Sequence, residues 1–230
     1  MYSEGKVEYR PLPLPDRVAL PPDESLKAAE AYRDYMKKRH TVRDFAPEPV
    51  AREVIAACVA AAGLAPSGAN HQPWHFVAVG DPGLKAKIRA AAEAEERAFY
   101  EGGAGDEWLK ALEPIGTGAA KPHLEVAPWL IVVFAQRWGV TKDGQRYKNY
   151  YVPESVGIAT GFLIAALHHA GLSCLTHTPN PMKFLGGLCG RPDEEKPVMI
   201  LATGIAAEGA TVPEVAKIKK PLGEILTVLA

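Results

Sequence analysis

Apolar side chains recur at helical spacing in three stretches of the first hundred residues. The first stretch predicts a helix that starts at residue 23 or 25 and reaches about residue 38. The second predicts a helix over residues 49–63, with Pro49 at the favoured first-turn position. The third follows Asp81, a residue type that commonly caps helices, and extends to about residue 100.

The rest of the pattern adds short apolar runs and two further helices. Strands are predicted at residues 75–79, 129–134, 172–178 and 198–204. The second of these is continuously apolar, which indicates a strand covered on both faces. Helices are predicted over residues 153–169 and 181–188. Because this order fits neither a regular doubly wound fold nor a barrel, we expect an α+β domain with one mixed central sheet flanked by helices.

Prolines mark both ends of the chain. Residues 1–22 contain five of them, which favours an extended arm over a place in the core, and residues 23–230 are expected to form a single domain. The tail after Glu208 is interrupted by Pro213 and Pro221, and we expect a second extended arm there. Arms of this kind are suited to wrapping around a partner chain.

Residues 101–106 hold three glycines in six positions. Glycine lowers the cost of backbone rearrangement, so this segment is compatible with the hinge of a mobile lid. An ordinary surface loop would have the same composition, and the sequence leaves both interpretations open.

Composition and charge narrow the class of protein. The formal net charge of −1 and the pI of about 6.7 argue against a nucleic-acid-binding surface or a polybasic membrane face. No apolar signal region precedes the first helix, and no apolar stretch approaches the roughly 20 residues of a membrane span. The three cysteines lie far apart, which indicates a reducing compartment. We therefore expect a soluble, cytoplasmic protein with no nucleic-acid or membrane partner.

Several common catalytic motifs do not occur. The sequence lacks G-x-G-x-x-G after a strand, G-x-x-x-x-G-K-[ST], G-x-S-x-G and H-E-x-x-H. It therefore gives no support to a Rossmann dinucleotide turn, a P-loop, a hydrolase elbow or zinc hydrolysis. The seven histidines are scattered, and no metal site is predicted.

Two segments carry candidate chemistry. Arg39 and Arg43, with Thr41 between them, offer two guanidinium forks and a hydroxyl, which together can grip a phosphate. Arg43 could equally form a surface ion pair with the next residue. Residues 65–74 gather small side chains, which permit close approach to a flat ligand, with hydroxyl and amide groups for its polar edge.

Read together, these two segments resemble the FMN-binding signature of the nitroreductase superfamily. Its elements are an Arg-x-Thr-x-Arg segment and, about twenty-five residues later, Ala-Pro-Ser-Gly-Ala-Asn-His-Gln-Pro-Trp. The likeness continues through Tyr150-Tyr151, residues 171–179, residues 190–192 and residues 210–222, and covers nearly all of the chain from about residue 30. It implies a nitroreductase-like fold, FMN as cofactor, and a homodimer whose active sites are each built from two chains.

The resemblance also implies which residues bind the flavin: Arg39, His40, Thr41, Arg43, Pro66, Ser67, Gly68, Thr176, Thr178 and Lys219. The Arg39–Arg43 segment would hold the phosphate and ribityl chain, and Lys219 would add a phosphate contact. Ser67 would lie against the ring system, and the hydroxyl of Thr178 would reach flavin N5, favouring stepwise one-electron transfer over hydride transfer. His40 and Lys219 depart from the pattern, because arginine is more typical at both positions.

Within the superfamily the chain is most similar to the iodotyrosine deiodinases. That likeness implies a substrate clamp of Glu96, Tyr100 and Lys121, in which the carboxylate binds the ammonium of a halotyrosine, and the cation and hydroxyl bind its carboxylate. The backbone N–H of Ala69 would meet the substrate phenolate. Taken alone, Glu96 could belong to a solvated helix face, but its spacing of four from Tyr100 puts both on one side of a helix.

The expected function is FMN-dependent reductive dehalogenation of a halogenated tyrosine, with Thr178 and Ala69 at the reacting atoms. The electron donor would be NAD(P)H or a separate reductase. Two other interpretations remain open at this stage: a broad NAD(P)H-dependent nitroreductase or enone reductase, and a flavin-storage or sensor module.

Overall fold

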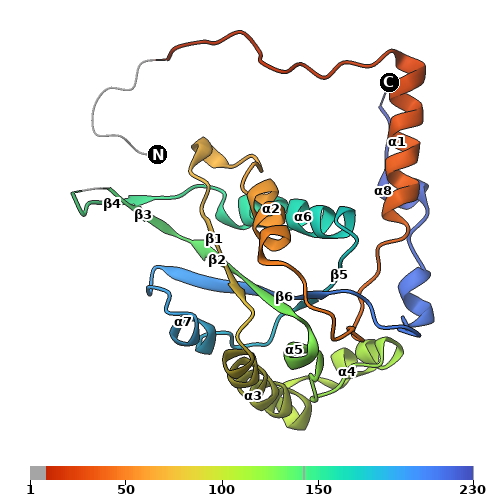
Figure 1. Ribbon diagram of the computed structural model, residues 1–230, viewed down its shortest axis with the longest axis vertical. Helices are drawn as coiled ribbons and strands as arrows, with labels where there is room; N and C mark the ends of the chain where they lie inside the picture. The colour runs from red at the N-terminus through yellow and green to blue at the C-terminus, as the bar shows by residue number, and fades with distance from the viewer. Residues whose placement is uncertain (1–8, 142, 230) are drawn as a thin grey trace.

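A four-stranded sheet forms the centre of the computed structural model, which describes residues 9–141 and 143–229 (Figure 1). The strands lie in the order β1-β2-β6-β5, and every neighbouring pair is antiparallel. A parallel component is added by one bridge between Thr41 and Cys174. A separate ribbon pairs β3 with β4. The strands span β1 Trp74–Val79, β2 Trp129–Gln136, β3 Trp138–Val140, β4 Arg146–Lys148, β5 Ser173–His177 and β6 Glu195–Gly204.

Helices cover both faces of this sheet: α2 and α6 lie on one side, and α3, α5 and α7 on the other (Figure 1). The helical elements span α1 Pro22–Met36, α2 Arg52–Ala62, η1 Gly68–Asn70, α3 Pro82–Ala98, η2 Phe99–Gly103, α4 Asp106–Leu112, η3 Glu113–Ile115, α5 His123–Val126, α6 Val152–His169, α7 Phe184–Leu188, η4 Glu214–Lys217 and α8 Leu222–Ile225. The α+β class expected from the sequence is confirmed.

Strand β2 divides the core in two. Val132 and Phe134 pack with α3, α5 and α7, whereas Ile131 and Val133 pack with α2 and α6. All four side chains are fully buried, as the continuous apolar run predicts for a strand covered on both faces. Complete burial of each such side chain stabilises the fold by roughly 1.5–3 kcal/mol.

Some element boundaries differ from those expected. Asp81 caps α3 as predicted, its carboxylate accepting a hydrogen bond from the Leu84 N–H at 2.7 Å. The prediction that Pro49 lies in the first turn of α2 is wrong, because that helix begins at Arg52. Val50 instead stays extended, and its carbonyl accepts a hydrogen bond from the Trp129 indole at 2.8 Å. The α4, α5, β3 and β4 elements were not predicted.

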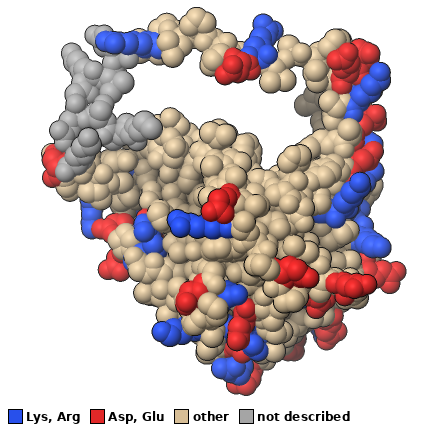
Figure 2. All heavy atoms as spheres, in the orientation of Figure 1, with Lys and Arg blue, Asp and Glu red and all other residues tan. Residues whose placement is uncertain are grey.

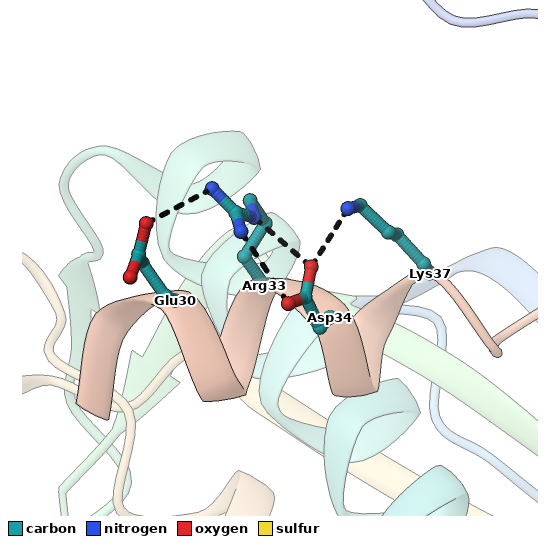
Figure 3. Close-up of polar contacts among 4 residues, drawn as sticks. All are labelled: Glu30, Arg33, Asp34 and Lys37. Carbon is teal, nitrogen blue, oxygen red and sulfur yellow. Dashed lines mark hydrogen bonds and ion pairs between the residues drawn. The ribbon is translucent and has the colours of Figure 1, made fainter. Parts of the chain in front are cut away.

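The first helix lies on the surface. None of the residues of α1 is buried, although Leu26 and Tyr32 are large and apolar. Figure 3 shows that one face of α1 carries a chain of ion pairs in which Asp34 contacts Arg33 at 3.1 Å and Lys37 at 2.7 Å. Hydrogen bonds from Arg33 and Lys37 lower the pKa of Asp34 to about 2. The side chains of this face are exposed to solvent, and exposed ion pairs of this kind contribute little to stability.

Like α1, the described parts of both arms are largely exposed to solvent. Residues 9–21 contain no helix or strand and stand away from the body of the molecule (Figure 1). Positive and negative side chains alternate along this arm and α1 rather than forming one charged patch (Figure 2). The first eight residues of the expected arm lie outside the described residues, and the division into an arm and one domain stays a prediction. Within the described ranges, no helix is both long and apolar enough to cross a membrane.

A buried carboxylate makes the fold sensitive to acid. Both oxygens of Glu195 accept hydrogen bonds from Arg191 at 2.6 Å, and one also accepts from Gln136 at 2.9 Å. Burial raises the pKa of Glu195, but the bonds from Arg191 and Gln136 outweigh it, and the net shift is downward. A lowered pKa in the folded state means that this stabilisation is present above the unfolded pKa and is lost as pH falls through the folded pKa.

We therefore expect Glu195→Gln to lower the free energy of unfolding by about 1–3 kcal/mol at neutral pH. The difference from the wild type should shrink as pH falls below the unfolded pKa of about 4.3, and should disappear once pH is below the lowered folded pKa, where the wild-type carboxylate is also protonated. Urea unfolding at several pH values measures both effects. The neighbouring Glu194→Gln, which removes only an outer ion pair with Arg146, should cost less than about 1 kcal/mol. Equal losses in the two variants would contradict this role for Glu195.

Candidate active site

A cavity of about 290 Å³ opens between α3, the segment after it, and the end of β5. Five parts of the chain contribute to its wall: Arg43, the C-terminal part of α3, residues 99–117, residues 121–123 and residues 175–180. The lining residues are Arg43, Glu95, Glu96, Phe99, Tyr100, Trp108, Leu112, Ile115, Thr117, Lys121, His123, Leu175, Thr176, His177, Thr178 and Asn180. All three residues of the predicted clamp are therefore in one cavity.

The clamp residues contact one another directly. Glu96 and Lys121 form an ion pair of 3.1 Å, in which the side chains are 14% and 5% exposed. Thr117 links Lys121 to Tyr100. Its hydroxyl accepts a hydrogen bond from Lys121 Nζ at 3.0 Å, and its carbonyl accepts one from the Tyr100 hydroxyl at 3.2 Å. An ion pair this buried is costly to break by removing one partner, since the remaining charge loses its compensation.

The backbone at Lys121 is also held in place. Its N–H donates to Glu93 Oε1 at 2.7 Å, and the same carboxylate pairs with Arg89 at 2.8 Å. The ammonium of Lys85 donates to the carbonyls of Glu125 and Ala127, and so fastens α3 to the end of α5. These contacts give the clamp lysine a fixed position relative to the helix that carries Glu96.

The glycine-rich segment of residues 101–106 leads into residues 108–115, three of which line the cavity; we call this part of the cavity wall its roof. Gly102 has a φ of +148°, a conformation that strongly favours glycine, and the chain then turns into α4 and η3. Trp108, Leu112 and Ile115 line the cavity, and Trp108 packs edge-on against Phe99 with ring centroids 5.0 Å apart. The cavity lining thus combines the charged clamp with apolar and aromatic side chains, as a ring-shaped ligand requires.

The end of β5 presents hydroxyls on one side and an imidazole on the other. Thr176 and Thr178 are exposed in the cavity, while His177 is buried, as the two-residue period of a strand dictates. Arg43 reaches the same cavity. Thr176, Thr178 and the three residues of the predicted clamp thus line one cavity, and their roles stay predictions.

His177 has a second histidine as its neighbour. The rings of His123 and His177 are nearly perpendicular, with centroids 6.0 Å apart. Burial, together with the smaller effect of the charge of Lys121, lowers the pKa of His123 to about 4 and that of His177 to about 3. Both imidazoles are therefore neutral at neutral pH. No role was predicted for His123 or His177 from the sequence. The two-residue period of a strand would, however, have placed His177 on the other face of β5 from Thr176 and Thr178.

A second, larger cavity of about 600 Å³ lies on the other side of the Arg39–Arg43 segment. It is lined by Lys38, Arg39, His40 and Lys217, among others, and is therefore basic. The segment runs beside β5, where the Val42 N–H donates to the Cys174 carbonyl at 3.4 Å. Arg39 and Arg43 thus line different cavities, and the expectation that both bind the phosphate stays a prediction.

Lys219 lines neither of these two cavities. It is exposed, and its ammonium donates to the Ala216 carbonyl at 2.7 Å. Lys217, the last residue of η4, lines the basic cavity instead. The run of basic residues at 217–220 is the sequence feature that indicates a phosphate contact in this part of the chain, but composition alone does not show which lysine would make it.

The loop of small residues adopts a constrained backbone. Ala69, Asn70 and Gln72 all have φ near +50°, a left-handed conformation that is unusual for non-glycine residues and clusters at functional sites. The hydroxyl of Ser67 accepts a hydrogen bond from the Gln72 N–H at 2.9 Å and closes the loop. A methyl group on Gly68 would lie 2.7 Å from the Tyr150 carbonyl, so only glycine fits there.

This loop does not line either cavity of its own chain. It lies at the start of α6, where the Gly68 N–H donates to Ser155 at 3.3 Å. One chain therefore does not bring Pro66–Ala69 to the Glu96–Lys121 clamp. No group of three or more metal-ligating side chains is found among the residues that the structure describes.

Comparison with known proteins defines the class. The profile of the Nitroreductase family matches residues 36–205, and the chain belongs to this family.

Within this family, the chain is strongly similar to iodotyrosine deiodinases. The chain is 52% identical over 193 residues to the iodotyrosine deiodinase of Haliscomenobacter hydrossis, covering 84% of this chain and 87% of that protein. It is 40% identical over 225 residues to iodotyrosine deiodinase 1 of Homo sapiens, covering 97% and 76%. A crystal structure of oxidized iodotyrosine deiodinase bound to FMN and 3-iodo-L-tyrosine has a TM-score of 0.69 at 34% identity, with 86% of this chain and 98% of that one covered.

Proposed function

We propose that the protein is an FMN-dependent reductive dehalogenase that acts on halogenated tyrosines. The observation that carries this proposal is the buried ion pair of Lys121 and Glu96, which shares a cavity with Tyr100 and with the hydroxyls of Thr176 and Thr178. A zwitterionic amino acid needs one cation and one anion, and a cavity of about 290 Å³ with an apolar roof offers room for its ring.

The two cavities fit the two ends of FMN. A phosphate suits the basic cavity of Lys38, Arg39, His40 and Lys217, where guanidinium and ammonium groups gather. A flat ring with polar edges suits the other cavity, where Thr178 and Arg43 offer donors. Bound reduced FMN would supply two electrons, which together with one proton convert an aryl iodide into the aryl hydrogen and iodide.

The protein's own groups would bind and orient the substrate. Glu96 would accept the α-ammonium, while Lys121 and Tyr100 would donate to the carboxylate. These contacts exchange one buried ion pair for two, so the cavity does not gain an unpaired charge. Trp108, Leu112 and Ile115 would cover the ring and exclude water from it, and Thr178 would hold its hydroxyl toward the cofactor.

We further propose that the active enzyme is a homodimer with shared sites. The loop of residues 66–69 is remote from the cavities of its own chain and would complete the site of the partner, with the Ala69 N–H donating to the substrate phenolate. Exposed apolar side chains support this arrangement, since large surfaces of this kind commonly mark interfaces. They occur on both arms and along α6: Leu12, Leu14, Val18, Tyr151, Ile158, Phe162, Ile218, Leu222, Ile225 and Leu229.

The proposed setting is the cytoplasm, with NAD(P)H or a separate reductase as electron donor. Three free thiols, of which Cys58 and Cys174 are buried, are compatible with a reducing compartment.

Ligand binding to the FMN-loaded protein tests the function. Titration with 3-iodotyrosine should quench flavin fluorescence at micromolar concentrations or below, because the ring stacks on the flavin. L-Tyrosine should bind less tightly, and nitrobenzene should be a poor substrate. Rapid NAD(P)H-driven reduction of nitrobenzene, with no response to 3-iodotyrosine, would contradict the proposal and favour a general nitroreductase.

A further inference from the structure

The carboxylate of Glu96 has a different neighbour at each oxygen. Lys121 Nζ lies 3.1 Å from Oε2, and His177 Nε2 lies 3.8 Å from Oε1. The three side chains come from separate parts of the chain, namely α3, the segment before α5, and β5. The carboxylate that would recognise an ammonium therefore lies between a cation and an imidazole, and both of these are buried.

The imidazole side of this arrangement is incomplete. The Nε2 atoms of His123 and His177 are fully buried, and neither has a hydrogen-bond partner within the described residues. A buried polar atom without a partner costs free energy, and such an atom commonly marks a place where a partner arrives with a ligand. For His177 the Glu96 Oε1 atom, 3.8 Å from Nε2, is a candidate partner.

The charge state of His177 suits a donor to this carboxylate. Burial lowers its pKa to about 3, and Lys121, His123 and Arg43 act in the same direction. At neutral pH the imidazole is neutral, so it can donate a hydrogen bond without cancelling the negative charge of Glu96. A second cation at this position would instead compete with the substrate ammonium.

We propose that His177 is a positioning residue for Glu96, which holds Oε1 so that Oε2 can pass from Lys121 to the α-ammonium of a bound amino acid. This inference rests on the proposed function. In the free enzyme Lys121 occupies Oε2. When the substrate carboxylate takes Lys121, the second oxygen is released, and a carboxylate held at its other oxygen turns directly to the ammonium. His123 packs edge-on against His177 and fixes its ring plane.

The test compares two ligands that differ only in the ammonium group. These are 3-iodotyrosine and its des-amino analogue, 3-(4-hydroxy-3-iodophenyl)propanoate. A positioning role toward Glu96 affects only the first ligand, whereas a general structural role affects both. Glu96→Gln serves as the reference, because it removes the charge that the ammonium needs and preserves the shape of the side chain.

His177→Leu should weaken 3-iodotyrosine binding by about 10–100-fold, as expected for the loss of a hydrogen bond to a charged group. Binding of the des-amino analogue should change by less than about twofold. His177→Gln, which keeps a neutral donor, should bind 3-iodotyrosine within about threefold of the wild type. In turnover, the leucine variant should raise KM for 3-iodotyrosine with little change in kcat.

Flavin content and the midpoint of thermal unfolding establish that each variant is folded, and His177→Val provides a second apolar replacement that favours a strand. Equal loss of both ligands, or unchanged binding of 3-iodotyrosine by the apolar variants, would overturn the proposal, as would a glutamine variant as weak as the leucine variant. A wild-type enzyme that binds the des-amino analogue but not 3-iodotyrosine would contradict the proposed function itself, and the inference with it.

Discussion

Replacing Lys121 with alanine is expected to weaken binding of 3-iodotyrosine by at least about 100-fold. The substitution removes the cation for the substrate carboxylate and also leaves Glu96 without its partner at 3.1 Å. Truncating one partner of a buried, hydrogen-bonded charge pair between two binding partners costs about 2–5 kcal/mol, and about 1.4 kcal/mol corresponds to a factor of ten in affinity. Quenching of flavin fluorescence by increasing concentrations of 3-iodotyrosine measures the change.

The matched control is Lys110→Ala. Lys110 lies on α4, in the same roof segment, but it is exposed and does not line the cavity. This variant should bind 3-iodotyrosine within about twofold of the wild type. If Lys121→Ala retained affinity within about threefold of the wild type, the clamp would not be the site of amino-acid recognition.

Replacing Arg39 with glutamine is expected to weaken binding of FMN by about 10–100-fold while leaving riboflavin binding unchanged. Arg39 lines the basic cavity that we assign to the phosphate, and charge-assisted contacts to phosphate are among the stronger hydrogen bonds. Riboflavin lacks the phosphate and provides the comparison. Arg43→Gln should weaken both flavins, because Arg43 lines the cavity that we assign to the ring.

Fluorescence titration of the apoprotein of the wild type and of each variant with both flavins gives the dissociation constants. Arg52→Gln, on the exposed start of α2, is the control for loss of a positive charge and should change neither. If Arg39→Gln weakened FMN and riboflavin equally, the phosphate would not lie in the basic cavity. The division of the Arg39–Arg43 segment between two ends of the cofactor would then be wrong.

The parts of the fold that depend on local pattern could be predicted from the sequence. The apolar run of β2 and the helical periodicities of α3 and α6 each bury a face large enough to be visible in the residue order. The β3–β4 ribbon could not be predicted, because its three-residue strands are largely exposed and depend on pairing with each other. The short helices α4 and α5 are likewise fixed by what they cover rather than by their own composition.

The candidate site also contains some residues that local spacing predicts and others that only the folded chain brings together. Glu96 and Tyr100 are four residues apart, and a helix places them together without any tertiary information. Lys121 and Thr178 were assigned through the family resemblance, and the structure brings both to the same cavity. No role was predicted for His177, because its neighbours Thr176 and Thr178 matched the flavin pattern. The role that we propose for it depends on its contact with Glu96, a residue 81 positions earlier in the chain.

Two other assignments required the folded chain. Separation of Arg39 from Arg43 follows from the path of their segment along β5, which no spacing rule in the sequence reveals. The distance of the Ser67 loop from its own cavity likewise depends on how α6 packs. A sequence motif identifies the residues of a shared site without stating which chain supplies each one.

Iodide release tests the central claim most directly. FMN-loaded enzyme, reduced with dithionite under anaerobic conditions, is mixed with 3-iodotyrosine, and the products are quantified. The account predicts one tyrosine and one iodide for every two electrons delivered, with product formation lost in Lys121→Ala at substrate concentrations that saturate the wild type. Reoxidation of the flavin by nitrobenzene but not by 3-iodotyrosine, with no tyrosine formed, would contradict it.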